Sequence, residues 1–430
     1  MEDTVFQNGV VGCGGAGFPA SVKLAGRAET LIVNAAECEP LLHKDKELLA
    51  RRADEFFAGL AEAMTRVGAR RGVIGLKRKY ADLIETVSRG CPENVVVYPL
   101  DDVYPAGDEF VLVYEVTGRI VGPGGLPKDV GVVVHNVETL INIGRRRPVT
   151  RKALTVAGLV AKPMTLEAPI GTPFRDVIDA AGGPVLPDFA VLVNGVMMGR
   201  LAEDLAEPVT KTTAGLIVLG RDHALVRRYA RRPEAVRRIA RAACDQCTFC
   251  TELCPRYLLN HPVEPHRVMR SFGLGQAVEG AVRFARYCSG CRLCSLAACP
   301  ENLDPSEICG LLKAGTGAAG TEERPAPAPR PHPLRFARRL PMSRLVRKLG
   351  LADLEDHAPW RDVRLAPRRV RIPLRQHAGV AAEPAVRAGQ AVREGDCIGE
   401  IPQGKLGAPV HASIDGRVVS VTDAVEIEAA

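Results

Sequence analysis

The sequence predicts a multidomain α/β and α+β protein with a small, helical, cysteine-rich domain in its middle. A length of 430 residues is enough for about three domains, and a hydrophobic fraction of 46% is ample for packed cores. Residues 1–150 alternate apolar strand patterns with amphipathic helix patterns, expected over 43–69 and 79–89. Short strands with glycine turns follow residue 154 and recur after residue 374. Between these two regions lie closely spaced cysteines.

The cysteines form two similar runs, separated by a helical linker that we expect over residues 262–284. Each run has three cysteines at two-residue gaps and a fourth that is followed by proline. This is the ferredoxin spacing, in which the fourth cysteine of a run ligates the other cluster. It predicts two [4Fe–4S] clusters, one on Cys244, Cys247, Cys250 and Cys299, and one on Cys288, Cys291, Cys294 and Cys254.

Zinc sites and disulfides are the alternatives for these cysteines. Zinc sites use paired Cys-x-x-Cys knuckles and need no third, evenly spaced cysteine. Disulfides need an oxidising compartment, but the N-terminus does not look like a signal peptide. No apolar run approaches the about 20 residues of a membrane span. Five cysteines remain unassigned, and this odd number favours a reducing cytoplasm: Cys13, Cys38, Cys91, Cys309 and Cys397.

The net charge of +7 is modest, and arginine-rich stretches contribute most of it. Eight arginines precede the first cysteine run: Arg221, Arg227, Arg228, Arg231, Arg232, Arg237, Arg238 and Arg241. A solvated helix face is the plain interpretation, and cations near an anionic cluster also raise its potential. A docking site for an acidic electron partner is the third interpretation. The charge does not indicate nucleic-acid binding.

A glycine-rich loop opens the chain, and three polar segments follow predicted strands. The loop runs from Gly12 to Pro19, and Lys23 follows it. Crowded glycines let backbone N–H groups approach a phosphate, although a tight turn explains them about as well. The polar segments are residues 34–40, 104–109 and 135–139. Open α/β sheets bind ligands where such strands end.

These segments, in this order, resemble the Rossmann-like flavin domain shared by the flavoprotein subunit of respiratory complex I and the RnfC component of the Rnf ferredoxin–NAD oxidoreductase. Cys13 and Ala36 stand where the complex I protein has arginine and aspartate. The resemblance implies that Glu109 takes the catalytic position beside the nicotinamide. It also implies an FMN and NADH site made of Gly12, Gly14, Gly15, Phe18, Lys23, Asn34, Glu37, Glu39, Gly107, Asp108, Glu109 and Asn136.

The resemblance continues through the rest of the chain. Residues 151–225 are similar to the β-grasp (SLBB) module that follows the flavin domain, and we expect it to be a structural bridge. Residues 361–430 resemble the barrel-sandwich hybrid of lipoyl and biotinyl carriers, and Lys405 falls near their modified hairpin without its usual flanking residues. The expected domains are therefore 1–150 for FMN and NADH, 151–225, 235–313 for the two clusters, 314–360 as a linker with a short helix over 342–356, and 361–430.

This domain order resembles the cobalamin reductases of propanediol-utilisation microcompartments and soluble relatives of RnfC. FMN can accept the electron pair of NADH and release single electrons to clusters. The resemblance therefore implies an NADH-dependent oxidoreductase whose final acceptor is a corrinoid or a partner protein. The alternative is an electron-input subunit of a larger complex, such as a methylene-tetrahydrofolate reductase or a bifurcating assembly. The expected location is the cytoplasm or the interior of a microcompartment.

Overall fold

The computed structural model describes residues 3–273, 279–315, 326 and 330–430. Its first unit is a four-stranded sheet in the order β3-β2-β1-β5, in which every neighbouring pair is parallel. The chain moves outward from β1 to β3 and then returns to the other side of β1. The sheet thus has a topological switch point between β1 and β5. The strands are β1 (Thr30–Ala35), β2 (Arg71–Lys77), β3 (Val95–Leu100) and β5 (Val132–Asn136).

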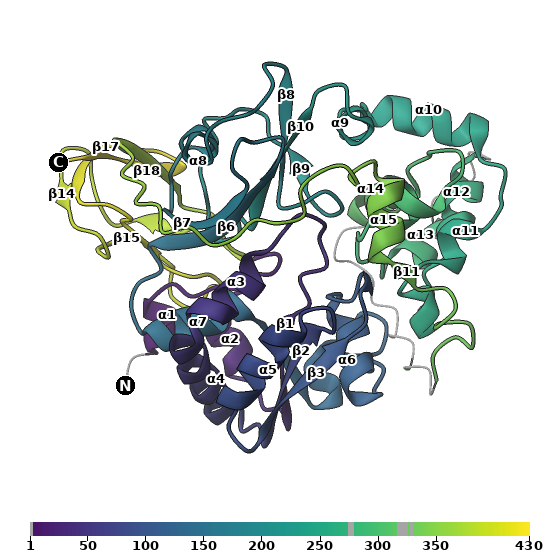
Figure 1. The fold of residues 1–430 in the computed structure, drawn as a ribbon, viewed down its shortest axis with the longest axis horizontal. Coiled ribbons are helices and arrows are strands. Elements are labelled where there is room, and N and C mark those ends of the chain that lie inside the picture. The colour runs from purple at the N-terminus through teal and green to yellow at the C-terminus, as the bar shows by residue number, and fades with distance from the viewer. Residues whose placement is uncertain (1–2, 274–278, 316–325, 327–329) are drawn as a thin grey trace.

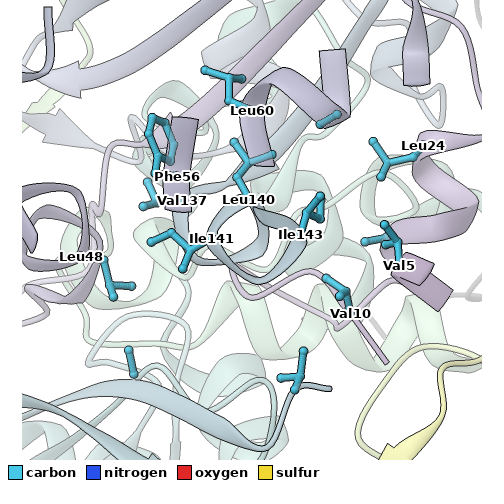
Figure 2. Packing of buried hydrophobic residues seen from close by; sticks show 14 of the residues in the cluster. Val5, Val10, Leu24, Leu48, Phe56, Leu60, Val137, Leu140, Ile141 and Ile143 are labelled. Carbon is cyan, nitrogen blue, oxygen red and sulfur yellow. The ribbon is translucent and has the colours of Figure 1, made fainter. Parts of the chain in front are cut away.

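The helices of this unit confirm the helical patterns over 43–69 and 79–89. The first pattern is interrupted at Arg52, which separates α3 from α4. A Cβ atom on Gly59 of α4 would lie 1.8 Å from the carbonyl oxygen of Leu140, so only glycine permits this close crossing of α4 and α7. The core around the crossing is shown in Figure 2. The elements are α1 (Thr4–Gln7), α2 (Ala20–Leu24), α3 (Lys44–Arg51), α4 (Ala53–Val67), α5 (Ala81–Gly90), α6 (Glu109–Thr117), η1 (Pro127–Val130) and α7 (Val137–Arg145).

The second unit is a five-stranded sheet in the order β7-β6-β10-β8-β9. Only its β6–β10 pair is parallel. The helix α8 (Phe174–Ala180) buries Phe174, Val177 and Ile178 against this sheet, an arrangement that fits the expected β-grasp. The strands are β6 (Arg151–Gly158), β7 (Met164–Pro169), β8 (Phe189–Val193), β9 (Arg200–Leu201) and β10 (Gly215–Gly220).

The cysteine-rich domain is helical, as expected. The predicted helical linker over 262–284 contains α12 and α13, and residues 274–278 between them lie outside the described residues. The buried side chains of Val268, Phe284 and Ile308 join α12, α13 and α14. The helices are α9 (Ala224–Tyr229), α10 (Pro233–Ala243), α11 (Phe249–Glu252), η2 (Tyr257–Leu259), α12 (Pro265–Gly273), α13 (Glu279–Ala285), a π turn η3 (Cys294–Ala298) and α14 (Pro305–Gly315).

A connector then returns along the molecule to the last domain. Most of the extended linker predicted over 314–333 lies outside the described residues. The strand β11 (Leu340–Pro341) pairs with β4 (Val103–Tyr104), and α15 (Met342–Lys348) buries Met342 and Leu345. The prediction that α15 continues to residue 356 was wrong, because Gly350 adopts a left-handed φ of 69° that ends the helical path.

The C-terminal domain consists of two small sheets, in the orders β12-β18-β17-β14 and β13-β15-β16. This agrees with the predicted barrel-sandwich. It lies at the opposite end of the molecule from the cysteine-rich helices (Figure 1). Its strands are β12 (Arg369–Pro373), β13 (Glu383–Pro384), β14 (Ala391–Val392), β15 (Cys397–Glu400), β16 (Val410–His411), β17 (Gly416–Val421) and β18 (Ala424–Ala429).

Candidate electron-transfer site

The carboxyl ends of β1 and β5 bring two predicted site residues together. Asn34 and Asn136 are register partners in this parallel pair. The Asn34 amide donates to the carbonyl oxygen of Gly107 over 2.9 Å. The Asn136 side-chain oxygen caps α7 by accepting a hydrogen bond of 3.0 Å from the backbone N–H of Glu138. Both asparagines therefore lie at the switch point, where open α/β sheets bind ligands.

The glycine-rich loop closes over this switch point. Its ends are held by a bridge between Val11 and Pro19. A Cβ atom on Gly14 would lie 3.2 Å from the Asn136 Cβ, whereas one on Gly15 would meet nothing within 4 Å. The loop thus presents bare backbone beside an open space. This shape fits the close approach of a phosphate or flavin, so the loop is suited to hold FMN.

Two charged residues flank the loop. Lys23 lies on α2 and Glu109 is the first residue of α6. Their side chains form an ion pair of 2.8 Å although 86 residues separate them in the sequence. About a third of each side chain is exposed, at 32% and 36%, so both groups can meet a ligand from solvent. Phe18, 41% exposed, stands at the edge of the same loop.

Glu37 and Glu39 bind backbone groups of neighbouring segments. Glu37 accepts a hydrogen bond of 2.9 Å from the N–H of Asp45 at the start of α3. Glu39 accepts hydrogen bonds of 2.9 and 2.8 Å from the N–H groups of Met197 and Met198 in the β-grasp unit. Burial raises the pKa of each carboxyl to about 7. Their role toward flavin and nucleotide stays a prediction.

A buried network of charged side chains lies beneath the switch point. The sequence motifs of the proposed flavin site did not predict this network. The Lys44 ammonium is 2.5 Å from an Asp45 oxygen and 3.3 Å from Glu138, which also pairs with Lys152. Burial alone would raise the pKa of Glu138, but the Lys152 and Lys44 ammonium groups outweigh it and lower the pKa. The second Asp45 oxygen accepts a hydrogen bond of 2.7 Å from Asn136. The only signal in the sequence is the charged run at 44–47, directly after the Asn34 segment.

The eight predicted ligand cysteines gather in two sets. One set lines a single pocket that opens at the surface: Cys244, Cys247, Cys250 and Cys299. The second set is more deeply buried, and its thiols lie within electrostatic range of one another: Cys254, Cys288, Cys291 and Cys294. Cys294 is also within range of Cys250, so the two sets adjoin.

Four thiols in each set match the ligand chemistry of a [4Fe–4S] cluster. Within the described residues, no group of three or more His, Cys, Asp or Glu side chains could hold a single metal ion.

The two cysteine runs have similar backbone conformations around their second cysteines. In the first run, Gln246 and Thr248 flank the second cysteine with φ values of 61° and 69°. In the second run, Gly290 and Arg292 occupy the same positions with φ values of 70° and 57°. Left-handed backbone at matching positions indicates that both loops wrap a cofactor of the same shape, although three of these four residues are not glycine.

The flavin unit touches the second cysteine set directly. The Tyr104 hydroxyl donates to the carbonyl oxygen of Cys291 over 2.7 Å. Asp108 caps α6 and also pairs with Arg256, two residues after Cys254, over 3.0 Å. The Arg256 guanidinium carbon lies 3.8 Å from the ring centroid of Phe110. Asp108 is thus only 6% exposed and joins two domains, a role that its motif did not predict.

Four protein families match consecutive parts of the chain. The Nuo51 FMN-binding domain matches residues 5–145, and the SLBB domain matches 154–201. The 4Fe–4S dicluster domain matches 243–304, and the RnfC barrel sandwich hybrid domain matches 358–430. These matches confirm the predicted fold class and cofactors.

The chain is also similar to known whole proteins. The cobalamin reductases PduS of Citrobacter freundii and Salmonella typhimurium are each 43% identical over 428 residues, which is 98% of this chain and 95% of theirs. The C component of the Na⁺-translocating ferredoxin:NAD⁺ oxidoreductase complex of Acetobacterium woodii is 36% identical over 60% of this chain and 58% of its own. A solved NAD⁺-reducing [NiFe]-hydrogenase in the H₂-reduced state aligns with a TM-score of 0.47 at 24% identity, over 75% of this chain and 63% of that chain.

No helix among the described residues has both the length and the apolar character to cross a membrane. An FMN-binding domain and a dicluster domain on one chain supply the means to divide the electron pair of NADH into single electrons. The identity to the reductases extends over nearly the full length of both proteins. The chain therefore belongs to the PduS cobalamin reductase family and is an NADH-dependent iron–sulfur flavoprotein.

Proposed function

We propose that electrons leave the flavin unit through the second cysteine set and reach the acceptor from the first. The observation that carries this order is the junction of Tyr104 and Asp108 with the segments of Cys291 and Arg256. These contacts hold the loop that lies beside the switch point against the second set. The first set lines an open pocket instead. When bound, FMN supplies the conversion from a two-electron donor to one-electron carriers.

We propose that different residues at the switch point bind FMN and the nicotinamide of NADH. We assign the FMN phosphate and ribityl chain to Gly12, Gly14, Gly15 and Lys23, with Asn34 and Asn136 beneath the flavin. Glu109 faces the same space from α6 and is assigned to the nicotinamide, with Gly107 beside it and Phe18 at the entrance. The support is their proximity in the fold, since Gly14 abuts Asn136, Asn34 binds Gly107, and Lys23 pairs with Glu109.

We propose a corrinoid as the final acceptor, because the full-length relatives are named cobalamin reductases. The sequence contains no corrinoid-binding Asp-x-His-x-x-Gly motif, so the corrinoid would be an external substrate. An electron-input subunit of a larger complex is the second candidate, and an exposed basic face beside the first cysteine set favours it.

The division of the chain after residues 150, 225, 313 and 360 is also proposed, with the four family matches as support. We propose a cytoplasmic location, because none of the thirteen cysteines forms a disulfide. The interior of a microcompartment is the narrower form of this proposal.

The test is anaerobic reduction of the purified protein by NADH. We expect about eight iron atoms per chain, bleaching of the flavin absorbance by NADH, and electron paramagnetic resonance signals from reduced clusters. Cob(III)alamin added afterwards should reoxidise both. Zinc in place of iron, or flavin that NADH does not bleach, would contradict the proposal. Cofactors that are reduced by NADH but not reoxidised by cob(III)alamin would reject the corrinoid as a direct acceptor.

A further inference from the structure

The helix α10 leads directly into the first cysteine set and has two different faces. Its inward face buries Val236 and Ala240, which are 6% and 1% exposed. Its outward face carries Arg237, Arg238 and Arg241, all exposed. The helix ends at Ala243, directly before the pocket-lining Cys244, so all three arginines lie within about two helical turns of the first set.

These three arginines contribute positive charge that nearby carboxylates do not offset. None of them forms an ion pair with a carboxylate of the described residues, whereas Arg145, Arg256 and Arg335 elsewhere are all paired. Seven arginines but only one glutamate occur between residues 227 and 241. Exposed carboxylates near the pocket are Asp245, which accepts a hydrogen bond from the backbone N–H of Cys247, and Glu301, two residues after Cys299. They are fewer than the arginines, so the local charge remains positive.

An exposed apolar residue lies in the chain between two residues that line the same pocket, Thr248 and Cys250. Phe249, between Cys247 and Cys250, is 49% exposed. Large apolar groups surrounded by charge are typical of the centre of a protein–protein interface. We name the surface of Arg237, Arg238, Arg241 and Phe249 the exit face. It lies on the cysteine-rich domain, at the opposite end of the molecule from the C-terminal barrel (Figure 1).

We propose that the exit face docks an acidic protein that accepts single electrons from the first cysteine set. This rests on the proposed function, in which the first set is the last carrier. Charge complementarity favours a partner of this kind. Thiolate-ligated clusters are anionic and would repel an acidic partner, whereas the three guanidinium groups attract it and accelerate encounter. Oxidation of one NADH releases NAD⁺, a proton and two electrons, so it reduces two one-electron partners in succession.

The competing possibility is that the first set reduces the corrinoid by direct encounter, with no carrier protein between them. It would not need a cationic surface with an apolar centre of this extent. The two possibilities differ in their dependence on salt, because attraction between exposed charges is screened within a Debye length of about 8 Å at physiological ionic strength.

The experiment compares two charge-reversal variants of the cofactor-loaded protein. The test variant is R237E/R238E/R241E. The control is R387E/R393E/K405E, which makes the same change of charge at exposed residues of the C-terminal barrel. The probe is an oxidised, acidic flavodoxin. Each protein is reduced with dithionite, freed of excess reductant and mixed with the probe at increasing ionic strength. This step does not depend on NADH, so a failed NADH site and a failed docking site give different results.

We expect the unmodified protein and the control to reduce the probe at a rate that falls about tenfold between low and high salt. The test variant should be about tenfold slower at low salt and nearly independent of salt. NADH should bleach the flavin equally in all three. A second variant, Phe249→Ser, should lower the rate while preserving its salt dependence. The proposal is overturned if the test variant and the control behave alike, or if the probe is reduced at a rate that salt does not change.

Discussion

Asp108 Oδ2 lies 3.0 Å from Nη2 of Arg256, and this ion pair closes the junction between the flavin unit and the second cysteine set. Both side chains are almost buried, at 6% and 11% exposed. The other Asp108 oxygen accepts hydrogen bonds from the first turn of α6. One carboxylate therefore holds the start of α6, which carries Glu109, and the loop that carries Cys254.

Replacing Arg256 by Gln should separate flavin reduction from cluster reduction. The change leaves the Asp108 carboxylate buried without its partner, which costs about 3–5 kcal/mol. We expect NADH to bleach the flavin at a normal rate and the clusters to be reduced more slowly, as measured by rapid-freeze electron paramagnetic resonance. The control is Arg267→Gln, which removes a pair between the half-exposed Arg267 and Glu264 and should have a much smaller effect. Equal rates of cluster reduction in both variants would show that the junction does not guide electrons.

Crossed ligation predicts that Cys254→Ser alters the cluster held by Cys288, Cys291 and Cys294. The structure places Cys254 with these three thiols, and it places Cys299 around the pocket of the first set. We expect Cys254→Ser to change one electron paramagnetic resonance signal and Cys299→Ser to change the other. Cys91→Ser, at a partly buried thiol on the flavin unit, is the control. If Cys254→Ser changes the same signal as Cys247→Ser, the crossed assignment is wrong.

Lys23→Met should weaken FMN retention. The substitution removes the countercharge that we assign to the phosphate and leaves the paired Glu109 carboxylate unneutralised beside it. We expect the FMN content after gel filtration to fall severalfold, with restoration by added FMN. Lys46→Met, on α3, is a matched loss of one ammonium group. Unchanged FMN content in Lys23→Met would remove this residue from the flavin site.

Glu109→Gln should slow flavin reduction by NADH by at least about tenfold while FMN content stays close to normal. The reason is that Glu109 is assigned to the nicotinamide and is not part of the glycine loop. Stopped-flow absorbance of the flavin measures the rate, and dithionite reduction of the same sample confirms that the flavin is intact. A normal rate with NADH would show that the assignment of Glu109 is wrong.

Lys211 should make the stability of the protein depend on pH. Its ammonium is buried, donates to the carbonyl oxygens of Gly9 and Pro409 over 2.7 Å each, and has no carboxylate partner among the described residues. Burial lowers its pKa to about 7 from 10.5. The unfolded chain thus binds the extra proton between these values, and the free energy of unfolding should rise with pH through this window.

The measurement compares urea unfolding of the unmodified protein and Lys211→Met at pH 6 and pH 9. The gain on raising the pH should be about 2–3 kcal/mol larger in the unmodified protein. The difference between the proteins isolates Lys211, because Glu37 and Glu39, whose pKa values are raised to about 7, contribute the opposite slope to both. His377 and His411 beside Lys211 titrate lower, with pKa values of about 4 and 3. Identical gains in the two proteins would contradict the prediction.

Local patterns in the sequence were sufficient to predict the features that depend on only a few neighbouring residues. The cysteine spacing predicted the two groups of four cysteines that the structure brings together, since a cubane constrains backbone over only a few residues around each thiolate. The polar residues after β1 and β5 predicted the switch point, because strand ends of a parallel sheet share one edge. Asn34 and Asn136 are register partners there. The helix predicted over 342–356 ends at Lys348, because Gly350 adopts a left-handed backbone conformation that a helix cannot continue through, whatever the amphipathic pattern beyond it.

Contacts between residues that are far apart in the sequence could be identified only from the tertiary structure. Glu39 binds backbone groups 158 residues away, and Asp108 pairs with Arg256 at a separation of 148 residues. Lys211 donates to the carbonyl oxygens of Gly9 and Pro409, which belong to the two ends of the chain. No pattern of neighbours encodes such contacts, because they depend on how separately folded domains dock and on which buried charges each interface must satisfy.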